Sequence, residues 1–79
     1  MKYKVEFTKK ALKAFLRLSE SIQDNIVRKI DVLSDDPYSN NNVKKLQGIE
    51  NCYRLRVGDY RVLYRVLNNK VIIEIINRI

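Results

Sequence analysis

The residues with the clearest chemical potential are three arginines in the C-terminal half of the chain, Arg54, Arg56 and Arg61. A guanidinium group stays charged at any working pH, and its planar fork of donors matches the oxygens of a phosphate. Such groups, held in place before a substrate binds, stabilise the extra negative charge of a phosphoryl transition state. These arginines therefore indicate a site for a phosphodiester.

Other residue types exclude most of the familiar hydrolase chemistries. The chain has no histidine, so it has no imidazole base, no Ser-His-Asp triad and no Cys/His zinc site. Its single cysteine, Cys52, cannot form an internal disulfide and has no histidine to activate its thiol. We expect neither a metal ion nor a cofactor.

The arginines lie on a predicted β-hairpin. The β-rich runs 53–57 and 60–67 are separated by Gly58-Asp59, a pair that suits a two-residue turn with positive φ. Asn68-Asn69 separates the second run from a third, 71–78. If these turns set the register, residue 57 faces 60, 56 faces 61 and 54 faces 63 in the first hairpin. In the second hairpin 66 faces 71, 65 faces 72 and 63 faces 74.

This register predicts a sheet with two different faces. The face for the helices to cover carries Tyr53, Leu55, Val57, Tyr60, Val62, Tyr64, Val66, Val71, Ile73 and Ile75. The other carries Arg54, Arg56, Arg61, Arg65 and Arg78, with Leu63, Ile72, Glu74 and Ile76 among them. Because like charges directly opposite each other destabilise a sheet, stability gives no reason for Arg56 to face Arg61. The competing interpretation is a solvated face kept basic to prevent edge pairing, with Glu74 moderating the arginine repulsion.

The N-terminal half supplies the elements that cover the apolar face. Residues 2–7 alternate in the manner of a half-buried strand, and Thr8 is a candidate N-cap for a short amphipathic helix. Ser19 or Ser21 caps a second helix, which Asp35-Asp36-Pro37 ends before an asparagine-rich loop at 39–42. The predicted fold is α+β in the order β-α-α-β-β-β, an antiparallel sheet with an αα-hairpin on one face. We expect residues 1–79 to form one domain.

The charge of the chain points to a polyanion or an acidic protein as partner. The formal net charge is +7, and residues 37–79 hold eight basic and three acidic groups, a net charge of +5. No stretch approaches the roughly 18 apolar residues of a membrane span, so we expect a cytoplasmic protein without membrane contact.

One motif and the order of the elements resemble a known family. The motif is Cys-Tyr-Arg-Leu-Arg-Val-Gly-Asp-Tyr-Arg-Val-Leu-Tyr at 52–64, preceded by Lys-Leu-Gln-Gly at 45–48. Over almost its whole length the chain looks like the RelE/ParE superfamily of bacterial and archaeal toxins, and it is closer to the RelE branch. The resemblance implies a RelE-like fold and cleavage of mRNA in the ribosomal A site, without metal, by attack of the ribose 2′-hydroxyl on the adjacent phosphate. It also implies an acidic RelB-like antitoxin and a ribosome with mRNA and 16S rRNA as partners.

The resemblance assigns catalytic roles to the three arginines. Arg61 contacts the scissile phosphate and stabilises its developing charge, while Arg54 and Arg56 hold the RNA backbone and help with proton transfer or charge balance. Arginine is a poor proton donor, so charge stabilisation is the part of these roles that arginine serves well. Salt-sensitive contacts to RNA are expected from Lys44, Lys45, Arg65 and Arg78.

The end of the chain departs from the family pattern. Family members generally continue past the last strand into a Gly-x-Arg segment and a short helix with a tyrosine, and that arginine and tyrosine count among the functional residues. The present sequence stops at Asn77-Arg78-Ile79 and has nothing to match them. This ending fits either a short or decayed member of the family or a truncated chain. The resemblance therefore implies the family but does not by itself imply that this chain is active.

Two other functions compete with RNA cleavage. A ParE-like toxin of the same fold inhibits DNA gyrase by protein contact, and an inactive relative binds only antitoxin or RNA. Three arginines that converge on one sheet face favour the nuclease, since a gyrase inhibitor does not need them.

Overall fold

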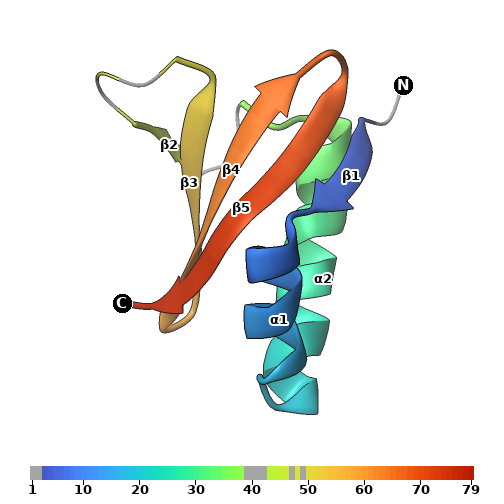
Figure 1. Ribbon diagram of the computed structural model, residues 1–79, viewed down its shortest axis with the longest axis vertical. Coiled ribbons are helices and arrows are strands. Elements are labelled where there is room, and N and C mark those ends of the chain that lie inside the picture. The colour runs from blue at the N-terminus through green and yellow to red at the C-terminus, as the bar shows by residue number, and fades with distance from the viewer. Residues whose placement is uncertain (1–2, 39–42, 47, 49) are drawn as a thin grey trace.

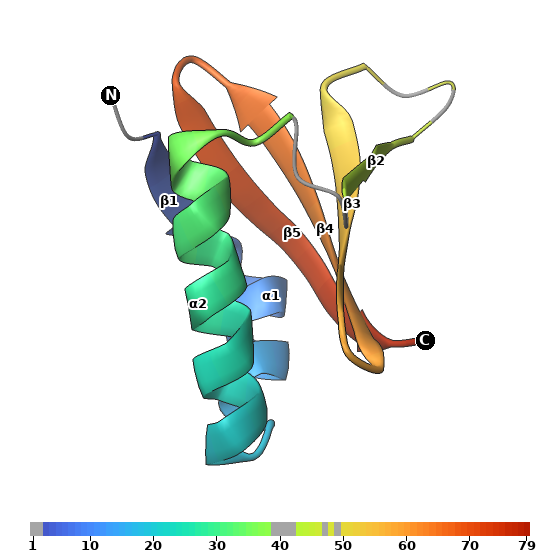
Figure 2. The same cartoon turned by 180° about the vertical axis from the view of Figure 1, so that it is seen from behind.

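The described part of the chain forms a five-stranded sheet with two helices on one side. The structure, a computed structural model, describes residues 3–38, 43–46, 48 and 50–79. Its elements are β1 (Lys4–Phe7), α1 (Lys9–Leu16), α2 (Glu20–Asp35), β2 (Val43–Lys45), β3 (Cys52–Val57), β4 (Tyr60–Leu67) and β5 (Lys70–Arg78). Figures 1 and 2 show both helices on the same side of the sheet, so the predicted α+β class with a helical hairpin on one face is confirmed. The predicted strand start at Lys2 and the asparagine-rich loop at 39–42 lie outside the described residues.

The sheet is mixed and has one strand more than the sequence pattern predicts. Its strand order is β1-β5-β4-β3-β2, and β1 lies parallel to β5 rather than antiparallel. The short strand β2 pairs antiparallel with β3 at the opposite edge. Alternation of polar and apolar residues shows which face a strand buries, but it shows neither the strand's neighbour nor its direction. A three-residue strand is also too short to carry a pattern.

The two predicted hairpin turns are present. Gly58 has a φ of 58°, and Asn68 and Asn69 have φ values of 52° and 63°, all in the left-handed region that such turns require. In the first hairpin the observed partners are those predicted: 57 with 60, 56 with 61 and 54 with 63. The second hairpin starts as predicted, with 66 opposite 71 and 65 opposite 72.

A β-bulge then shifts the register of the second hairpin. Tyr64 lies opposite Ile73 and Leu63 lies opposite Ile75, so Glu74 is an extra residue on β5. The predicted pairing of residues 63 and 74 is therefore wrong, and every later residue of β5 changes face. The alternating pattern could not reveal this because residues 75 and 76 are both isoleucine.

The core lies between the helices and the near face of the sheet. Thr8 caps α1, since its Oγ1 accepts a hydrogen bond of 3.1 Å from the Ala11 backbone N–H. α2 begins after Ser19. The buried apolar side chains are Ala11, Ile26, Ile30, Leu33, Leu55, Val57, Val62, Tyr64, Val66, Val71, Ile73 and Ile76. Neither described helix has the length and apolar character needed to cross a membrane.

Tyr64 joins the sheet to the segment after α2. Its side chain is 1% exposed, and its hydroxyl donates a hydrogen bond of 2.6 Å to the Pro37 carbonyl oxygen. The ring also stacks on that of Tyr53, with 5.6 Å between centroids. Burial raises the pKa of the Tyr64 hydroxyl, with smaller contributions from nearby groups that include Tyr53 and Asp36.

This pKa shift predicts how stability depends on alkaline pH. A tyrosine in the unfolded chain ionises near pH 10, whereas folded Tyr64 keeps its proton to higher pH. Unfolding above about pH 10 therefore releases a proton, and stability declines as pH rises further. Tyr64→Phe should cost about 1 kcal/mol at neutral pH, because the Pro37 carbonyl loses its donor, and should flatten the alkaline decline. Urea unfolding midpoints between pH 8 and 11 measure both effects. The half-buried Tyr60, as Tyr60→Phe, is the control, and an unchanged alkaline slope in Tyr64→Phe would contradict the prediction.

Candidate nucleic-acid interface

Figures 1 and 2 show that no described element covers the sheet face that points away from the helices. The arginines of β3 and β4 belong to this face because they alternate with the buried Leu55, Val57 and Val62. We call this surface the arginine face. Cross-strand pairing puts on it Lys44, Leu46, Cys52, Arg54, Arg56, Arg61, Leu63, Arg65, Ile72, Glu74, Ile75 and Asn77.

Arg56 and Arg61 form a direct cross-strand pair on this face. The Val66 N–H donates to the Asn51 carbonyl oxygen at 2.9 Å, and hydrogen-bonded pairs recur at every second position from there. The 56–61 pair therefore lies at a non-hydrogen-bonded position, where Cβ atoms are only about 4.5–5.5 Å apart. The tight turn thus roots two cationic side chains next to each other despite their mutual repulsion.

The next row of the sheet repeats the arrangement with Lys44 directly opposite Arg54. We refer to Lys44, Arg54, Arg56 and Arg61 as the cation cluster. Among the described residues, no carboxylate lies within ion-pair distance of these four side chains. Arg65, by contrast, pairs with Glu74, with 3.7 Å between Nη1 and Oε1. The cluster therefore keeps its positive charge for an external anion.

Two of the guanidinium groups are held through Nε alone. Arg61 Nε donates to Asn77 Oδ1 at 3.1 Å, and Arg56 Nε donates to the Gly58 carbonyl oxygen at 3.4 Å. The Nη groups of both arginines have no partner within the described part of the chain. Each side chain can therefore present two terminal nitrogens to phosphate oxygens.

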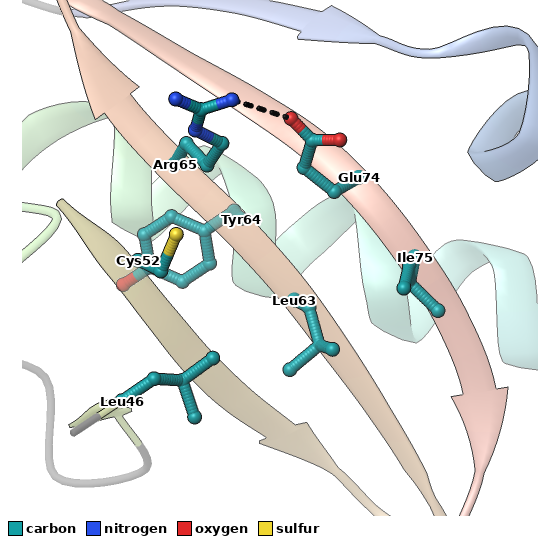
Figure 3. Close-up of a pocket in the computed structure, with 7 residues that line it drawn as sticks. All are labelled: Leu46, Cys52, Leu63, Tyr64, Arg65, Glu74 and Ile75. Atoms are coloured by element: carbon teal, nitrogen blue, oxygen red, sulfur yellow. Dashed lines mark ion pairs between the residues drawn. The ribbon is translucent and has the colours of Figure 1, made fainter. Parts of the chain in front are cut away.

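A largely apolar hollow of about 390 Å³ adjoins the cluster. Figure 3 shows Leu46, Cys52, Leu63 and Ile75 around it, with the ion pair of Arg65 and Glu74 at one end. Leu63 is the neighbour of Arg54 across the strand pair, so the apolar and cationic surfaces are continuous. The face as a whole suits a ligand that is both anionic and partly apolar, such as a nucleotide chain or an acidic amphipathic segment.

The structure gathers most of the predicted site residues and separates two of them. Arg54, Arg56, Arg61 and Lys44 come together in the cation cluster, and Arg65 shares their face. Lys45, however, pairs with Tyr53 and so belongs to the helix-side face. The expectation that Arg78 shares the arginine face is wrong, because the bulge sets Arg78 opposite Tyr60.

Asn77 is the site residue that the sequence pattern missed. Without the bulge it would belong to the helix-side face, and nothing in a single sequence distinguishes it there. An asparagine near the end of a strand carries no chemical signal until its partner is known. Ile75 enters the hollow for the same reason.

Comparison with known proteins identifies relatives over nearly the whole chain. A family model described as the ParE toxin of the type II toxin-antitoxin system parDE matches residues 5–78. A RelE-like toxin protein of Escherichia coli is 33% identical over 78 residues, which are 96% of this chain and 80% of the relative. The mRNA interferase toxin RelE of E. coli K12 is 30% identical over 79 residues, 98% of this chain and 81% of the relative.

A solved structure agrees with these relatives in fold. RelE in the archaeal RelE–RelB complex from Pyrococcus horikoshii has a TM-score of 0.86 to this chain and is 30% identical. The match covers 99% of this chain and 96% of that one. The element order and the sheet described above are therefore those of a known toxin fold.

The repulsion in the cation cluster predicts a stabilising substitution. Arg56→Gln removes one charge from the 56–61 pair, so the melting temperature should rise by about 1–4 °C at low salt. The gain should shrink in about 1 M salt, where charges are screened beyond roughly 3 Å. Arg65→Gln is the matched control, because it breaks an ion pair instead of relieving repulsion. Equal gains in both variants, or a gain independent of salt, would refute this account of the cluster.

Proposed function

Because this chain belongs to the RelE/ParE superfamily, as a RelE-like toxin of a toxin–antitoxin system, we propose that it arrests translation by cleaving mRNA on the ribosome. The observation that carries the proposal is the cation cluster, four positive side chains that have no carboxylate partner among the described residues and lie on a sheet face that no described element covers. The name of the E. coli relative, an mRNA interferase toxin, supports the same substrate.

The proposed reaction is attack of a ribose 2′-hydroxyl oxygen on the adjacent phosphorus. A bond forms from the 2′ oxygen to phosphorus as the hydroxyl proton passes to water, and the bond to the 5′ oxygen of the next nucleotide breaks. Water supplies a proton to that 5′ oxygen, so the products are a 2′,3′-cyclic phosphate and a 5′-hydroxyl. Negative charge grows on the phosphate oxygens in the transition state, and the terminal nitrogens of Arg61 are available to bind them. Arg54 and Arg56 hold the flanking backbone. All three arginines stay protonated, so their contribution is charge stabilisation.

Other basic residues contribute to RNA binding in this proposal. Lys44 extends the cation cluster across β2, and Arg65 shares the face while paired to Glu74. Lys45 and Arg78 lie on the helix-side face, so they contact ribosomal RNA away from the scissile phosphate. Such contacts are electrostatic, and affinity for the ribosome falls steeply with salt.

The antitoxin partner follows from the relatives and from the charge. In the P. horikoshii complex, RelE is bound to RelB, and a RelB-like antitoxin is the partner of this toxin. We propose that it is acidic, since it has to complement a chain of net charge +7. Occupation of the arginine face by such a chain would exclude RNA from the cation cluster.

Inhibition of DNA gyrase is the second candidate function. The match to a ParE toxin model favours it, since ParE-like toxins act by protein contact. Such contact requires neither the opposed Arg56 and Arg61 nor their free terminal nitrogens. The two candidates therefore differ in how strongly activity depends on Arg61.

Arg61→Ala should lower the rate of mRNA cleavage by at least about 10²-fold, because removal of one preorganised transition-state donor typically costs that much. The rate is measured on a reporter mRNA in a purified translation system. Arg28→Ala is the control, since it removes the same charge from an exposed position on α2. The circular dichroism spectrum should be unchanged in both variants, and both should still bind the antitoxin. Cleavage at the parental rate by Arg61→Ala would refute the assignment, and gyrase inhibition without cleavage would establish the second candidate.

A further inference from the structure

Asn77 lies opposite Arg61 only because of the bulge in β5. In a regular ladder Ile76 would be the residue opposite Arg61, and the guanidinium would have an apolar neighbour. The extra residue, Glu74, moves Ile76 into the core, where it is 5% exposed, and moves Asn77 to the arginine face. Asn77 Oδ1 then accepts a hydrogen bond from Arg61 Nε at 3.1 Å.

The backbone on both sides of Asn77 is fixed. Ile76 before it is buried opposite Val62, which is 0% exposed. After it, the Ile79 N–H donates to the Asp59 carbonyl oxygen at 2.8 Å and ties the strand end to the turn between β3 and β4. The amide oxygen is therefore presented from a constrained position rather than from a free end.

The hydrogen bond selects one direction for the Arg61 side chain. A half-buried arginine samples many rotamers, and repulsion from Arg56 on β3 favours those that lean toward β5, the strand that carries Asn77. A single bond at Nε restricts the rotation of the guanidinium plane. It also leaves both Nη groups on the outer edge, where a phosphate would approach.

The chemical type of the partner matters as much as its position. On the same face, Arg65 is paired to the carboxylate of Glu74 at 3.7 Å, which compensates its charge. Asn77 offers Arg61 an acceptor of similar shape with no charge. Arg65 is thus neutralised, whereas Arg61, which is proposed to contact the scissile phosphate, is held in place and keeps its full charge.

We propose that Asn77 is a positioning residue that aims the Arg61 guanidinium at the scissile phosphate without neutralising it. This inference rests on the proposed function, and it adds a residue and the bulge at Glu74 to the site. Loss of the hydrogen bond should therefore slow cleavage alone, whereas an added negative charge should also weaken ribosome binding.

The kinetic test uses Asn77→Ala, which removes the acceptor, and Asn77→Asp, which keeps an acceptor and adds a charge. Single-turnover cleavage on preformed toxin–ribosome complexes should slow by roughly tenfold in Asn77→Ala at unchanged ribosome affinity, because only the orientation of Arg61 is lost. Asn77→Asp should slow cleavage at least as much and should also weaken ribosome binding, because it lowers the charge of the cluster. In an Arg61→Ala background, Asn77→Ala should have no further effect. Asn25→Ala, at an exposed position of α2, is the matched control.

A second measurement separates failure of this inference from failure of the proposed function. Hydrogen exchange of the Arg61 Nε–H, followed by NMR on the free toxin, should be slow in the parental chain and in Asn77→Asp and fast in Asn77→Ala. Parental cleavage and parental exchange in Asn77→Ala would overturn the inference and leave the proposed function intact. An additive effect of Asn77→Ala on Arg61→Ala would also overturn it, since Asn77 would then act independently of Arg61. If the parental chain cleaves no mRNA, the proposed function fails. Independently of that result, fast exchange of the Arg61 Nε–H in the parental toxin would show that Asn77 does not hold Arg61.

Discussion

The tight turn at Gly58-Asp59, which sets Arg56 directly opposite Arg61, is the constraint on which the arginine face depends. A tight turn holds the two charges opposite each other, and the cost is of the order of a few tenths of a kcal/mol up to about 1 kcal/mol. The same strands bury Leu55 and Val62 completely on the other face. Full burial of each such side chain contributes about 1.5–3 kcal/mol, so the core outweighs the repulsion. The helices make this possible because they cover one face and leave the other to the arginines (Figure 1).

The bulge at Glu74 completes the arginine face. It moves Ile76 into the core, brings Ile75 to the hollow and sets Asn77 beside Arg61. Glu74 itself compensates Arg65 at the far end of the hollow (Figure 3). A single inserted residue thus divides the face into a neutralised part and a cationic part. In the proposed function the cationic part binds the phosphate that is cleaved.

The sequence alone predicts the first hairpin and its arginines well. Gly58-Asp59 requires a tight turn, and a tight turn leaves one register for Arg54, Arg56 and Arg61. Thr8 is likewise found as a cap because capping depends on local geometry. Three features depend on which strands meet in space: the pairing of β1 with β5, the strand at Val43–Lys45 and the bulge. The residue pattern along a single strand does not show which strands meet. For this reason Asn77 was missed, Arg78 was assigned to the wrong face, and the pattern did not place Lys45 on the helix-side face.

The most direct test of the central claim is to map mRNA 3′ ends by primer extension after the purified chain acts on one mRNA with and without ribosomes. If the cation cluster acts on mRNA held by the ribosome, cuts appear within the codon in the A site and are absent from free mRNA. Cuts that appear equally on free mRNA would show a general ribonuclease instead. Arrest of translation without any cut would contradict the claim that these arginines serve phosphodiester cleavage.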